Sequence, residues 1–399
     1  MHQNIQNLVN VAAKQERMVI GLMSGTSMDG LDIALCSIKG SGRDTQFVLK
    51  AFTTVDYTKD FKEKILSIFS KEMVALETLC LLNAWVGKQH GKMILNALKL
   101  WNISPENVDM IASHGQTIYH APKSLHPHSE YDPATLQIGD GDHIAVTTGI
   151  LTMSDFRQKH IAAGGEGAPL AVYGDYLLCS HPVENRLLLN MGGIANFTYL
   201  SAGCNLDQVF STDTGTGNTL MDAYTRAQFA PLAYDTNGTI AASGKINSAL
   251  LSALKAHSFF TLDLPKTIGP ELFNLDFLAN AQKLSKTLDL SPEDVMATLN
   301  RFSAETIAEC IKSSIPAGTK FNMYSSGGGM HNPVLMQHLT NLLPDATLYS
   351  SDVIGINPDA KEAILFALLA NEAVVGTPLF AGGHATKIPI TMGKISFPK

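Results

Sequence analysis

The chain opens with a strand pattern that is interrupted by a loop. Residues 19–23 are apolar or glycine, and apolar residues alternate with polar or small ones over 31–37. The loop between them contains Gly25 and Gly30. Because successive side chains of a strand point to opposite faces, this pattern predicts a β-hairpin over 18–38.

A second hairpin of the same design is predicted in the middle of the chain. Residues 186–200 place a glycine turn at 192–193 between two apolar runs. Helical spacing of apolar residues covers 73–101 in the first half and follows the glycine turns at 215–217 and 327–329 in the second. Strands that alternate with helices predict an α/β fold, and the repeated plan predicts two similar domains.

The length agrees with two domains. A single hydrophobic core stops growing at roughly 250 to 300 residues, and this chain has 399. We expect an N-terminal domain over 1–182, of which 1–17 are an extension, and a C-terminal domain over 183–399. A terminal helix from about 359 is expected to cross back toward the first domain. Two such domains would leave a ligand cleft between them.

Composition and charge favour a small-molecule ligand. The formal net charge is −7 and the Lys and Arg residues are scattered, which argues against nucleic acid or an anionic membrane as the partner. The five cysteines form no CxxC pair, so neither a disulfide framework nor a zinc finger is indicated.

The sequence has no segment typical of membrane insertion or secretion. No apolar run approaches the ~20 residues of a membrane span, and the first 17 residues lack a signal-peptide core. The sequence therefore predicts a cytoplasmic protein.

Glycine turns at strand ends suit phosphate groups, because main-chain N–H groups are accessible where no Cβ intervenes. None of the turns is a P-loop, and neither 139–144 nor 215–220 has the third glycine of a dinucleotide-binding turn. The remaining interpretation is that the two hairpins hold a phosphate chain, with 327–329 at the nucleoside end. One such turn alone is more often only a turn, but three in this order favour a nucleotide site.

Eight motifs resemble the series of the anhydro-N-acetylmuramic acid kinases in order, from about 18 to 393. They are GLMSGTSMDG, SHGQT, SDFR, AAGGEGAPL, NMGGIAN, DTGTGN, SGGGMHNP and DAKEA. The resemblance implies a two-domain actin-like ATPase (ribonuclease H-like) fold of the α/β class, with ATP and Mg²⁺ as cofactors. It also implies a phosphotransferase with an alcohol acceptor. Water would open the ring of 1,6-anhydro-N-acetylmuramic acid while O6 takes the γ-phosphoryl group, which gives N-acetylmuramate 6-phosphate in peptidoglycan recycling.

The resemblance assigns the nucleotide to the three glycine turns. The first turn would donate N–H and hydroxyl hydrogen bonds to the β- and γ-phosphates. The expected nucleotide-binding residues are Gly25, Thr26, Ser27, Met28, Asp29 and Gly30, then Gly192, Gly193 and Asn196, then Gly327, Gly328, Gly329 and Asn332.

Asp213 is the expected catalytic base. It stands at the end of a predicted strand, just before a glycine turn, where a carboxylate can come within hydrogen-bond reach of a water in a cleft. The resemblance gives the family's corresponding acid this role. The alternative is that Asp213 caps the helix that begins near Asn218, although the intervening glycines would make it a distant cap.

Magnesium is expected at Asp213 and Glu362 on the basis of the resemblance. Glu362 has a second interpretation, because Asp359 and Glu362 match a D-x-x-E capping box at the start of the last helix. Asp29 and Asp32 are further candidates for the metal.

The sugar is expected to bind polar segments of the first half. Asp155 and Arg157 are predicted to form a buried pair that presents a fixed guanidinium group to hydroxyl or carboxylate groups, with a purely structural ion pair as the alternative. The expected substrate-binding residues are His114, Gln116, Asp155, Arg157, Glu166, Gly167 and Ala168.

Alternative functions stay open at this point. Levoglucosan kinases share most of the motifs, so the series determines the reaction type better than the sugar. An ordinary hexosamine kinase would use Asp213 to deprotonate a free hydroxyl and would hydrolyse no bond. A protein of another class, an ATP-gated binder, would need a partner surface. The resemblance further implies a homodimer whose ligand is a small sugar.

Overall fold

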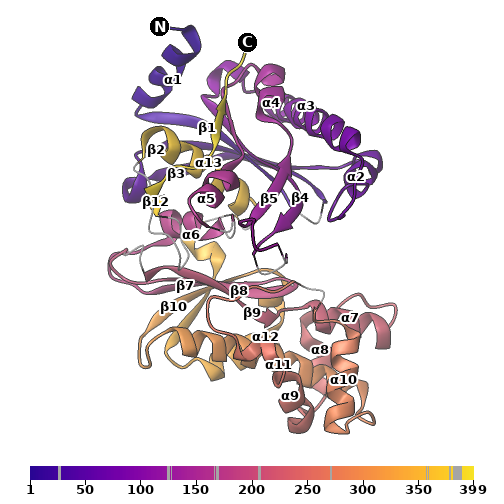
Figure 1. Cartoon of the computed structure of the whole chain (residues 1–399). Helices are drawn as coiled ribbons and strands as arrows, with labels where there is room; N and C mark the ends of the chain where they lie inside the picture. The colour runs from indigo at the N-terminus through magenta and orange to yellow at the C-terminus, as the bar shows by residue number, and fades with distance from the viewer. Residues whose placement is uncertain are drawn as a thin grey trace. The chain divides into compact units, whose positions relative to one another are not determined.

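The computed structural model divides into two compact units (Figure 1). Unit 1 comprises Met1–Leu178 and Asp359–Lys399, and unit 2 comprises Cys179–Pro358. The predicted boundary at 182 lies four residues after this division. The structure describes residues 1–25, 28–123, 126, 128–165, 167, 170–204, 208–269, 272–355, 357, 359–376, 379–380 and 389–399. Among these residues, no helix is both long and apolar enough to cross a membrane.

In its described residues, unit 1 is built on a mixed sheet of seven strands. A meander of three antiparallel strands, β3-β2-β1, is continued by the parallel neighbours β4 and β6 and by the antiparallel edge strand β14, while β5 pairs with β4. The strands are β1 (Glu16–Ser24), β2 (Gly30–Lys39), β3 (Gln46–Asp56), β4 (Met110–Ala121), β5 (Ala134–Ile138), β6 (Thr152–Ser154) and β14 (Lys394–Ser396). The short strands β12 (Leu379–Phe380) and β13 (Pro389–Ile390) pair with each other.

The helices of unit 1 bury apolar faces beside this sheet. In α3, the buried residues Leu82, Val86, His90 and Ile94 recur every four positions, which is the spacing of one helix face. The helices are α1 (Gln3–Ala13), α2 (Lys59–Leu66), α3 (Leu76–Leu100), α4 (Gly141–Thr148), α5 (Phe156–Ala162), α6 (Ala171–Cys179) and α13 (Lys361–Val375).

Helix α13 is central to unit 1 although it comes from the end of the chain. Its residues 363–372 are all buried, and it packs against β1, β2 and β4. Gly21 of β1 lies so close to α13 that a Cβ would overlap the carbonyl oxygen of Ala363. Only glycine permits this approach, so the last long helix and the first strand are packed main chain against main chain.

Unit 2 repeats the strand order of unit 1. The antiparallel meander β9-β8-β7 is continued by the parallel strands β10 and β11, just as β3-β2-β1 is continued by β4 and β6. The strands are β7 (Arg186–Met191), β8 (Ile194–Leu200), β9 (Phe210–Thr216), β10 (Phe321–Ser326) and β11 (Ala346–Ser350). This repeated order confirms the predicted two-domain, actin-like α/β class.

The long helix of unit 2, α11, begins with strong local signals. Ser291 caps it by accepting the N–H of Asp294, and Pro292 occupies the first turn, where its missing N–H is not needed. One apolar cluster joins α11 to the sheet and a second joins it to α7, α9 and α10. The helices are α7 (Thr219–Gln228), α8 (Thr239–Ser243), α9 (Ser248–Lys255), α10 (Leu275–Ser285), α11 (Pro292–Ser314) and α12 (Pro333–Leu342). Short 3-10 helices are Gly42–Asp44, Pro105–Asn107, Thr236–Gly238, Ser258–Thr261, Gly328–His331 and Ser351–Ile354.

Candidate active site

The first glycine turn joins β1 to β2 in unit 1. Thr26 and Ser27, two predicted phosphate ligands, lie outside the described residues. Met28 has a left-handed backbone, with φ of 57°, and its side chain is part of the apolar core. Only the main chain of Met28 is therefore available to a ligand, whereas Asp29 has an exposed side chain.

A series of buried, hydrogen-bonded polar side chains supports the start of this turn. Ser24 Oγ donates to Gln116 Oε1 at 2.5 Å and lies 2.7 Å from the hydroxyl of Tyr57, which is 2.9 Å from His90 Nε2. Gln116 Nε2 donates to the carbonyl oxygens of Gly25 and Thr117, both at 3.2 Å. Gln116 is fully buried, so in this structure it anchors the turn rather than presenting its amide to a sugar.

Tyr57 and His90 were not identified from the sequence. Burial lowers the pKa of His90 to about 4 and raises that of Tyr57, so both side chains are neutral near pH 7. The only local signal was a histidine on the apolar face of a predicted helix, and its tyrosine partner lies 33 residues away.

A second polar group in unit 1 surrounds Arg157 on α5. Arg157 Nε donates to His114 Nε2 at 2.8 Å, and Arg157 Nη1 donates to the carbonyl oxygen of Gly167 at 2.7 Å. The N–H of Gly167 donates to His160 Nδ1, also at 2.8 Å. Residues 157 and 160 of one short helix thus hold both main-chain groups of Gly167, which has a left-handed φ of 79°. Glu166 and Ala168, the other predicted residues of this segment, lie outside the described residues.

The environment of Arg157 changes the charge state of its neighbours. Burial, and after it the charge of Arg157, together lower the pKa of His114 to about 3. Burial also lowers the pKa of Arg157, to about 10, while Glu362 raises it. Near pH 7 a neutral imidazole therefore accepts from a cationic guanidinium group.

The predicted buried pair between Asp155 and Arg157 is wrong. Asp155 has a left-handed backbone, with φ of 58°, and forms an ion pair with Lys394 on β14. Helix α5 begins at the next residue, Phe156, and residues two positions apart on a helix do not face each other. The carboxylate that raises the pKa of Arg157 is Glu362 instead.

The predicted capping box at the start of the last helix is also wrong. Helix α13 begins at Lys361, and its N-cap, Ala360, makes no side-chain hydrogen bond. Glu362 has an exposed surface at the helix start, although the protein around its carboxylate excludes part of the water. Desolvation by the surrounding protein raises its pKa, Arg157 lowers it, and Asp32 raises it again.

Asp32 lies on β2 in the same electrostatic group. Its Oδ1 accepts a hydrogen bond from Thr54 Oγ1 at 2.6 Å. Burial raises the pKa of Asp32, and repulsion from Asp359 and Asp29 adds to that increase. Within the described part of the chain, no three His, Cys, Asp or Glu side chains are grouped as a metal site.

In unit 2 the glycine turns at 192–193, 217 and 327–329 come together. Gly217 N–H donates to the carbonyl oxygen of Gly193 at 2.8 Å, and a Cβ on Gly217 would overlap the carbonyl oxygen of Gly192. A Cβ on Gly327 would lie 2.7 Å from Asn190 Oδ1, and one on Gly329 would lie 2.7 Å from Met191 Cβ. These glycines are needed for close packing of one turn on another.

Two glycines of the same group have space above them. A Cβ on Gly192 would find Ile194 O at 3.7 Å as its nearest neighbour, and one on Gly328 would find Asn218 Nδ2 at 3.6 Å. Both distances are ordinary van der Waals contacts. A ligand can therefore approach the main chain of Gly192 and Gly328, because neither residue has a Cβ and no neighbouring atom crowds that side.

The two asparagines predicted to bind nucleotide have different surroundings. Asn332 caps α12, since its Oδ1 accepts the N–H of Leu335 at 3.1 Å, and this use occupies the side-chain oxygen. Asn196 lies on β8 and pairs in register with Asn190 and Asp213. Nucleotide binding by either side chain stays a prediction.

Asp213 lies inside β9, not at the strand end as predicted, because the strand continues to Thr216. The N-cap of the following helix is Asn218, so the interpretation of Asp213 as a helix cap is wrong. The N–H of Ile268 donates to Asp213 Oδ2 at 2.8 Å. Burial raises the pKa of Asp213 to about 6, although the Ile268 N–H lowers it. A carboxylate with that pKa is a competent general base near pH 7.

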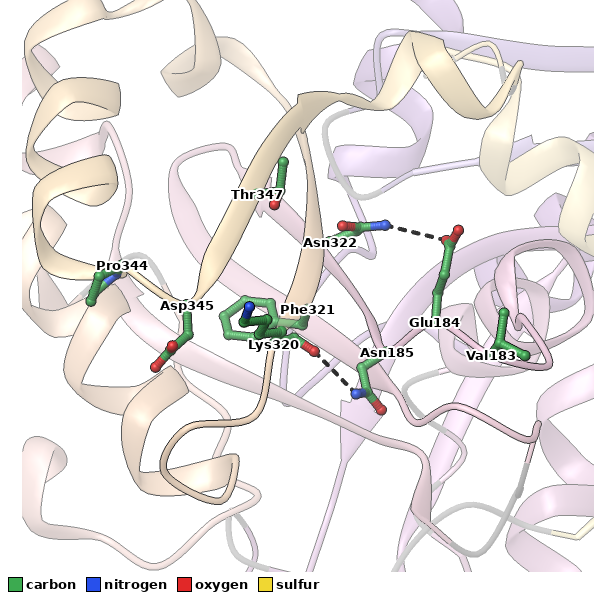
Figure 2. Close-up of a pocket in the computed structure, with 9 residues that line it drawn as sticks. All are labelled: Val183, Glu184, Asn185, Lys320, Phe321, Asn322, Pro344, Asp345 and Thr347. Atoms are coloured by element: carbon green, nitrogen blue, oxygen red, sulfur yellow. Dashed lines mark hydrogen bonds between the residues drawn. The ribbon is translucent and has the colours of Figure 1, made fainter.

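A cavity of about 410 Å³ is separate from these turns (Figure 2). It lies where β10 and β11 begin, with Lys320, Asn322 and Asp345 among its lining residues. Asn322 Nδ2 donates to Glu184 Oε2 at 3.3 Å (Figure 2). The glycine turns follow the carboxyl ends of β7 and β10, whereas this cavity lies at the amino ends of β7, β10 and β11. None of the predicted site residues lines it.

Comparisons with known proteins give a consistent result over the whole chain. The family model described as anhydro-N-acetylmuramic acid kinase matches residues 17–395. The anhydro-N-acetylmuramic acid kinase of Pseudoalteromonas atlantica is 57% identical over 400 residues, covering 100% of both chains. The protein of the same name from Caldanaerobacter subterraneus subsp. tengcongensis is 37% identical over 398 residues, covering 98% of this chain and 100% of its own.

Solved structures are more distant. Component A of (R)-2-hydroxyglutaryl-CoA dehydratase from Acidaminococcus fermentans has a TM-score of 0.42 and 12% identity, covering 90% of this chain and 99% of its own. A ROK family glucokinase from Streptomyces griseus, in complex with glucose and AMPPNP, has a TM-score of 0.36 and 11% identity, covering 88% of this chain and 98% of its own. Likenesses of this size carry no argument about the site.

Proposed function

Because the chain belongs to the anhydro-N-acetylmuramic acid kinase family, we propose that Asp213, the glycine turns and the group around Arg157 carry out that family's reaction. The enzyme is an ATP-dependent kinase that opens 1,6-anhydro-N-acetylmuramic acid and phosphorylates O6. The product is N-acetylmuramate 6-phosphate, an intermediate of peptidoglycan recycling. The observation that carries the assignment of residues is the raised pKa of Asp213, together with the N–H of Ile268 that donates to its carboxylate.

Asp213 acts as the general base in the proposed mechanism. With a pKa of about 6 it is mostly ionised near pH 7 and removes a proton from a water molecule. The water oxygen forms a bond to the anomeric carbon, the bond from that carbon to O6 breaks, and its electron pair stays on O6. O6 then bonds to the γ-phosphoryl group, whose bond to ADP breaks.

The open positions at Gly192 and Gly328 fit a nucleotide. Their main chain is accessible, and main-chain N–H groups without a neighbouring Cβ are suited to phosphate oxygens. ATP supplies the phosphoryl group that is transferred. Gln116 donates to the carbonyl oxygen of Gly25, so the main chain at Gly25, where the first turn begins, is held before a phosphate arrives.

Magnesium fits the carboxylates of unit 1 better than Asp213. Asp32 and Glu362 supply hard oxygen ligands of the kind that Mg²⁺ prefers, and their mutual repulsion would be relieved by a divalent cation. The group bonded to Asp213 Oδ2 is an N–H donor, which suits a base more than a metal ligand. We therefore assign Asp32 and Glu362 to the metal and Asp213 to the proton.

The Arg157 group would hold the sugar. His114 and the Gly167 carbonyl oxygen accept hydrogen bonds from two nitrogens of the guanidinium group, Nε and Nη1. Because the guanidinium group is planar, these two bonds also fix the direction of the third nitrogen, Nη2. A hydroxyl or carboxylate oxygen of the substrate would accept from it. Asp155, Glu166, Gly167 and Ala168 remain predicted contacts of the same sugar.

The decisive experiment measures ATP consumption by the purified enzyme with 1,6-anhydro-N-acetylmuramic acid, with levoglucosan and N-acetylglucosamine as controls. We expect turnover with the first sugar and a product heavier by one phosphoric acid, which includes the added water. In ¹⁸O-labelled water the label should enter at the anomeric carbon, after correction for exchange by mutarotation. Turnover with levoglucosan alone would change the substrate, and turnover without ring opening would identify an ordinary kinase.

Two properties of the whole protein are further proposals. A cytoplasmic location is supported by the use of ATP as phosphoryl donor. A homodimer is supported only by the family resemblance, and light scattering coupled to size-exclusion chromatography tests it.

A further inference from the structure

A segment far along the chain holds the main chain of Asp213. Strand β9 is the edge of the unit 2 sheet, and residues 264–268, which we call the strap, run beside its outer side. The N–H of Asp213 donates to the carbonyl oxygen of Lys266 at 2.9 Å. Two residues later, the N–H of Ile268 donates to Asp213 Oδ2 at 2.8 Å. The strap therefore contacts both the main chain and the carboxylate of the base.

Thr212 attaches the strap to β9. The N–H of Lys266 donates to Thr212 Oγ1 at 3.0 Å. The Thr212 hydroxyl in turn has two main-chain oxygens within reach, Lys266 O at 3.3 Å and Asp213 O at 3.2 Å. Thr212 is 3% exposed, so these bonds form where water does not compete.

The side chain of Lys266 attaches the strap to a second segment, the 3-10 helix that contains Phe259 and Phe260. Its Nζ donates to the carbonyl oxygen of Phe259 at 3.0 Å. The same ammonium group lies 4.4 Å from the centre of the Phe259 ring and 5.7 Å from that of Phe260, within the range of a cation–π interaction. Lys266 is thus bonded through its main chain to β9 and through its side chain to the 3-10 helix Ser258–Thr261.

We propose that Thr212 and Lys266 are positioning residues that set the orientation of the Asp213 carboxylate through the strap. The terminal torsion of an aspartate is broad, so the carboxylate needs a fixed donor to hold its plane. Ile268 N–H binds Oδ2, and among the described residues Oδ1 has no hydrogen-bond partner. Oδ1 is then the atom that accepts the proton from water. This inference rests on the proposed role of Asp213 and adds the residues that make its geometry productive.

The test compares Thr212→Val with Thr212→Ser in steady-state assays with 1,6-anhydro-N-acetylmuramic acid and ATP. Valine keeps the branched shape and removes the hydroxyl, whereas serine keeps the hydroxyl. Because a displacement of about 1 Å can cost about 100-fold in rate, we expect kcat to fall ~10- to 100-fold for valine, with both KM values within about twofold. Serine should restore most of kcat. An unchanged kcat for Thr212→Val, or an equal loss for Thr212→Ser, would overturn the inference.

Thr214→Val is the matched control. Thr214 is on the same strand and fully buried, but its hydroxyl donates to Ala195 O on β8 at 3.0 Å, away from the strap. We expect its kcat to stay within about threefold of that of the parent enzyme. A loss as large as that of Thr212→Val would assign both effects to general destabilisation of β9 and reject the strap. Lys266→Met gives an independent measurement, with a fall in kcat expected, in case Thr212→Val does not fold.

A double variant separates this inference from the proposed base. If Asp213→Asn removes turnover, adding Thr212→Val should cause little further loss, because residues that act through one group are not additive. A further loss of the same factor as in the parent enzyme would show that Thr212 acts independently of Asp213 and would reject the inference. Full turnover by Asp213→Asn would instead reject the proposed base itself.

Discussion

At the scale of single residues, Asp213 combines a functional advantage with a cost in stability. Burial raises its pKa to about 6, well above the ordinary value for aspartate. The unfolded chain releases this proton at a lower pH than the folded chain does. Ionised Asp213 therefore destabilises the fold, and this penalty develops as the pH rises from about 4 to about 6.

The first prediction concerns Asp213→Asn. We expect kcat to fall by about 10² to 10⁴, the usual contribution of a general base, while the affinity for ATP stays near that of the parent. The melting temperature should rise at pH 8, because the amide does not ionise, and this gain should shrink as the pH falls toward 4. Calorimetry at both pH values and a nucleotide titration measure these effects. Equal loss of turnover and ATP binding would contradict the role of Asp213 as a base.

The second prediction is a pH dependence of activity. Protonated Asp213 cannot accept a proton from water, so kcat/KM should fall about tenfold per pH unit below a pH of about 6. The profile is measured with the anhydro sugar in a constant-ionic-strength buffer. The folded fraction is measured at each pH to check that the enzyme stays intact. A flat profile down to pH 5 would remove Asp213 from the proton transfer.

At the scale of structural elements, the glycine turns divide into two kinds. Gly21 is required for packing, because a Cβ would overlap the carbonyl oxygen of Ala363 on α13. At Gly192 a Cβ would meet only ordinary contacts, the nearest at 3.7 Å. The same residue type thus serves stability at one position and, under the proposed function, ligand access at the other.

A pair of alanine substitutions tests this division. We expect Gly21→Ala to destabilise the protein by about 3 kcal/mol, as overpacking of a core does. We expect Gly192→Ala to leave the melting temperature nearly unchanged and to raise the KM for ATP, because the new methyl group occupies the space for the phosphates. Denaturant unfolding and steady-state kinetics separate the two effects. Normal ATP affinity in Gly192→Ala would argue against a phosphate site at this turn.

The sequence predicted those elements whose signals are local. The hairpins β1–β2 and β7–β8 follow from strand alternation around glycine turns, and the repeat of that pattern predicted the repeated sheet. Pairs between distant residues could not be predicted in this way. Lys394 pairs with Asp155 across 239 positions of the sequence, and the strap contacts Asp213 from 55 positions away. Neither contact leaves a pattern in the neighbouring residues.

Glu362 shows a second reason for error. The D-x-x-E spacing is a sound local signal for a helix cap, but α13 starts two residues after Asp359, at Lys361. Packing of α13 against β1 and β2, rather than the cap, determines where this helix lies. The family resemblance had assigned Glu362 to the magnesium ion, and its charged surroundings support that assignment as a proposal.

At the scale of the whole molecule, unit 1 is discontinuous in sequence and unit 2 is continuous. Truncation after residue 358 removes α13, whose residues 363–372 are all buried. We therefore expect the truncated chain to lose amide protection across unit 1 while unit 2 retains it. Hydrogen exchange read by mass spectrometry measures both. A control truncation after Ser396 keeps α13 and β14 and should protect both units; full protection of unit 1 without α13 would contradict the prediction.

The position of α13 in the sequence has a consequence for synthesis on the ribosome. The first 178 residues leave the exit tunnel with the α13-facing side of β1 uncovered, since the helix that covers it follows 180 residues later. At elongation rates of about 5 to 20 residues per second, this delay lasts roughly 10 to 40 s. Unit 2 emerges in one piece and can complete its core first. The amino-terminal half of the nascent chain is thus the last to mature, and during this interval it is the part that most needs protection by chaperones.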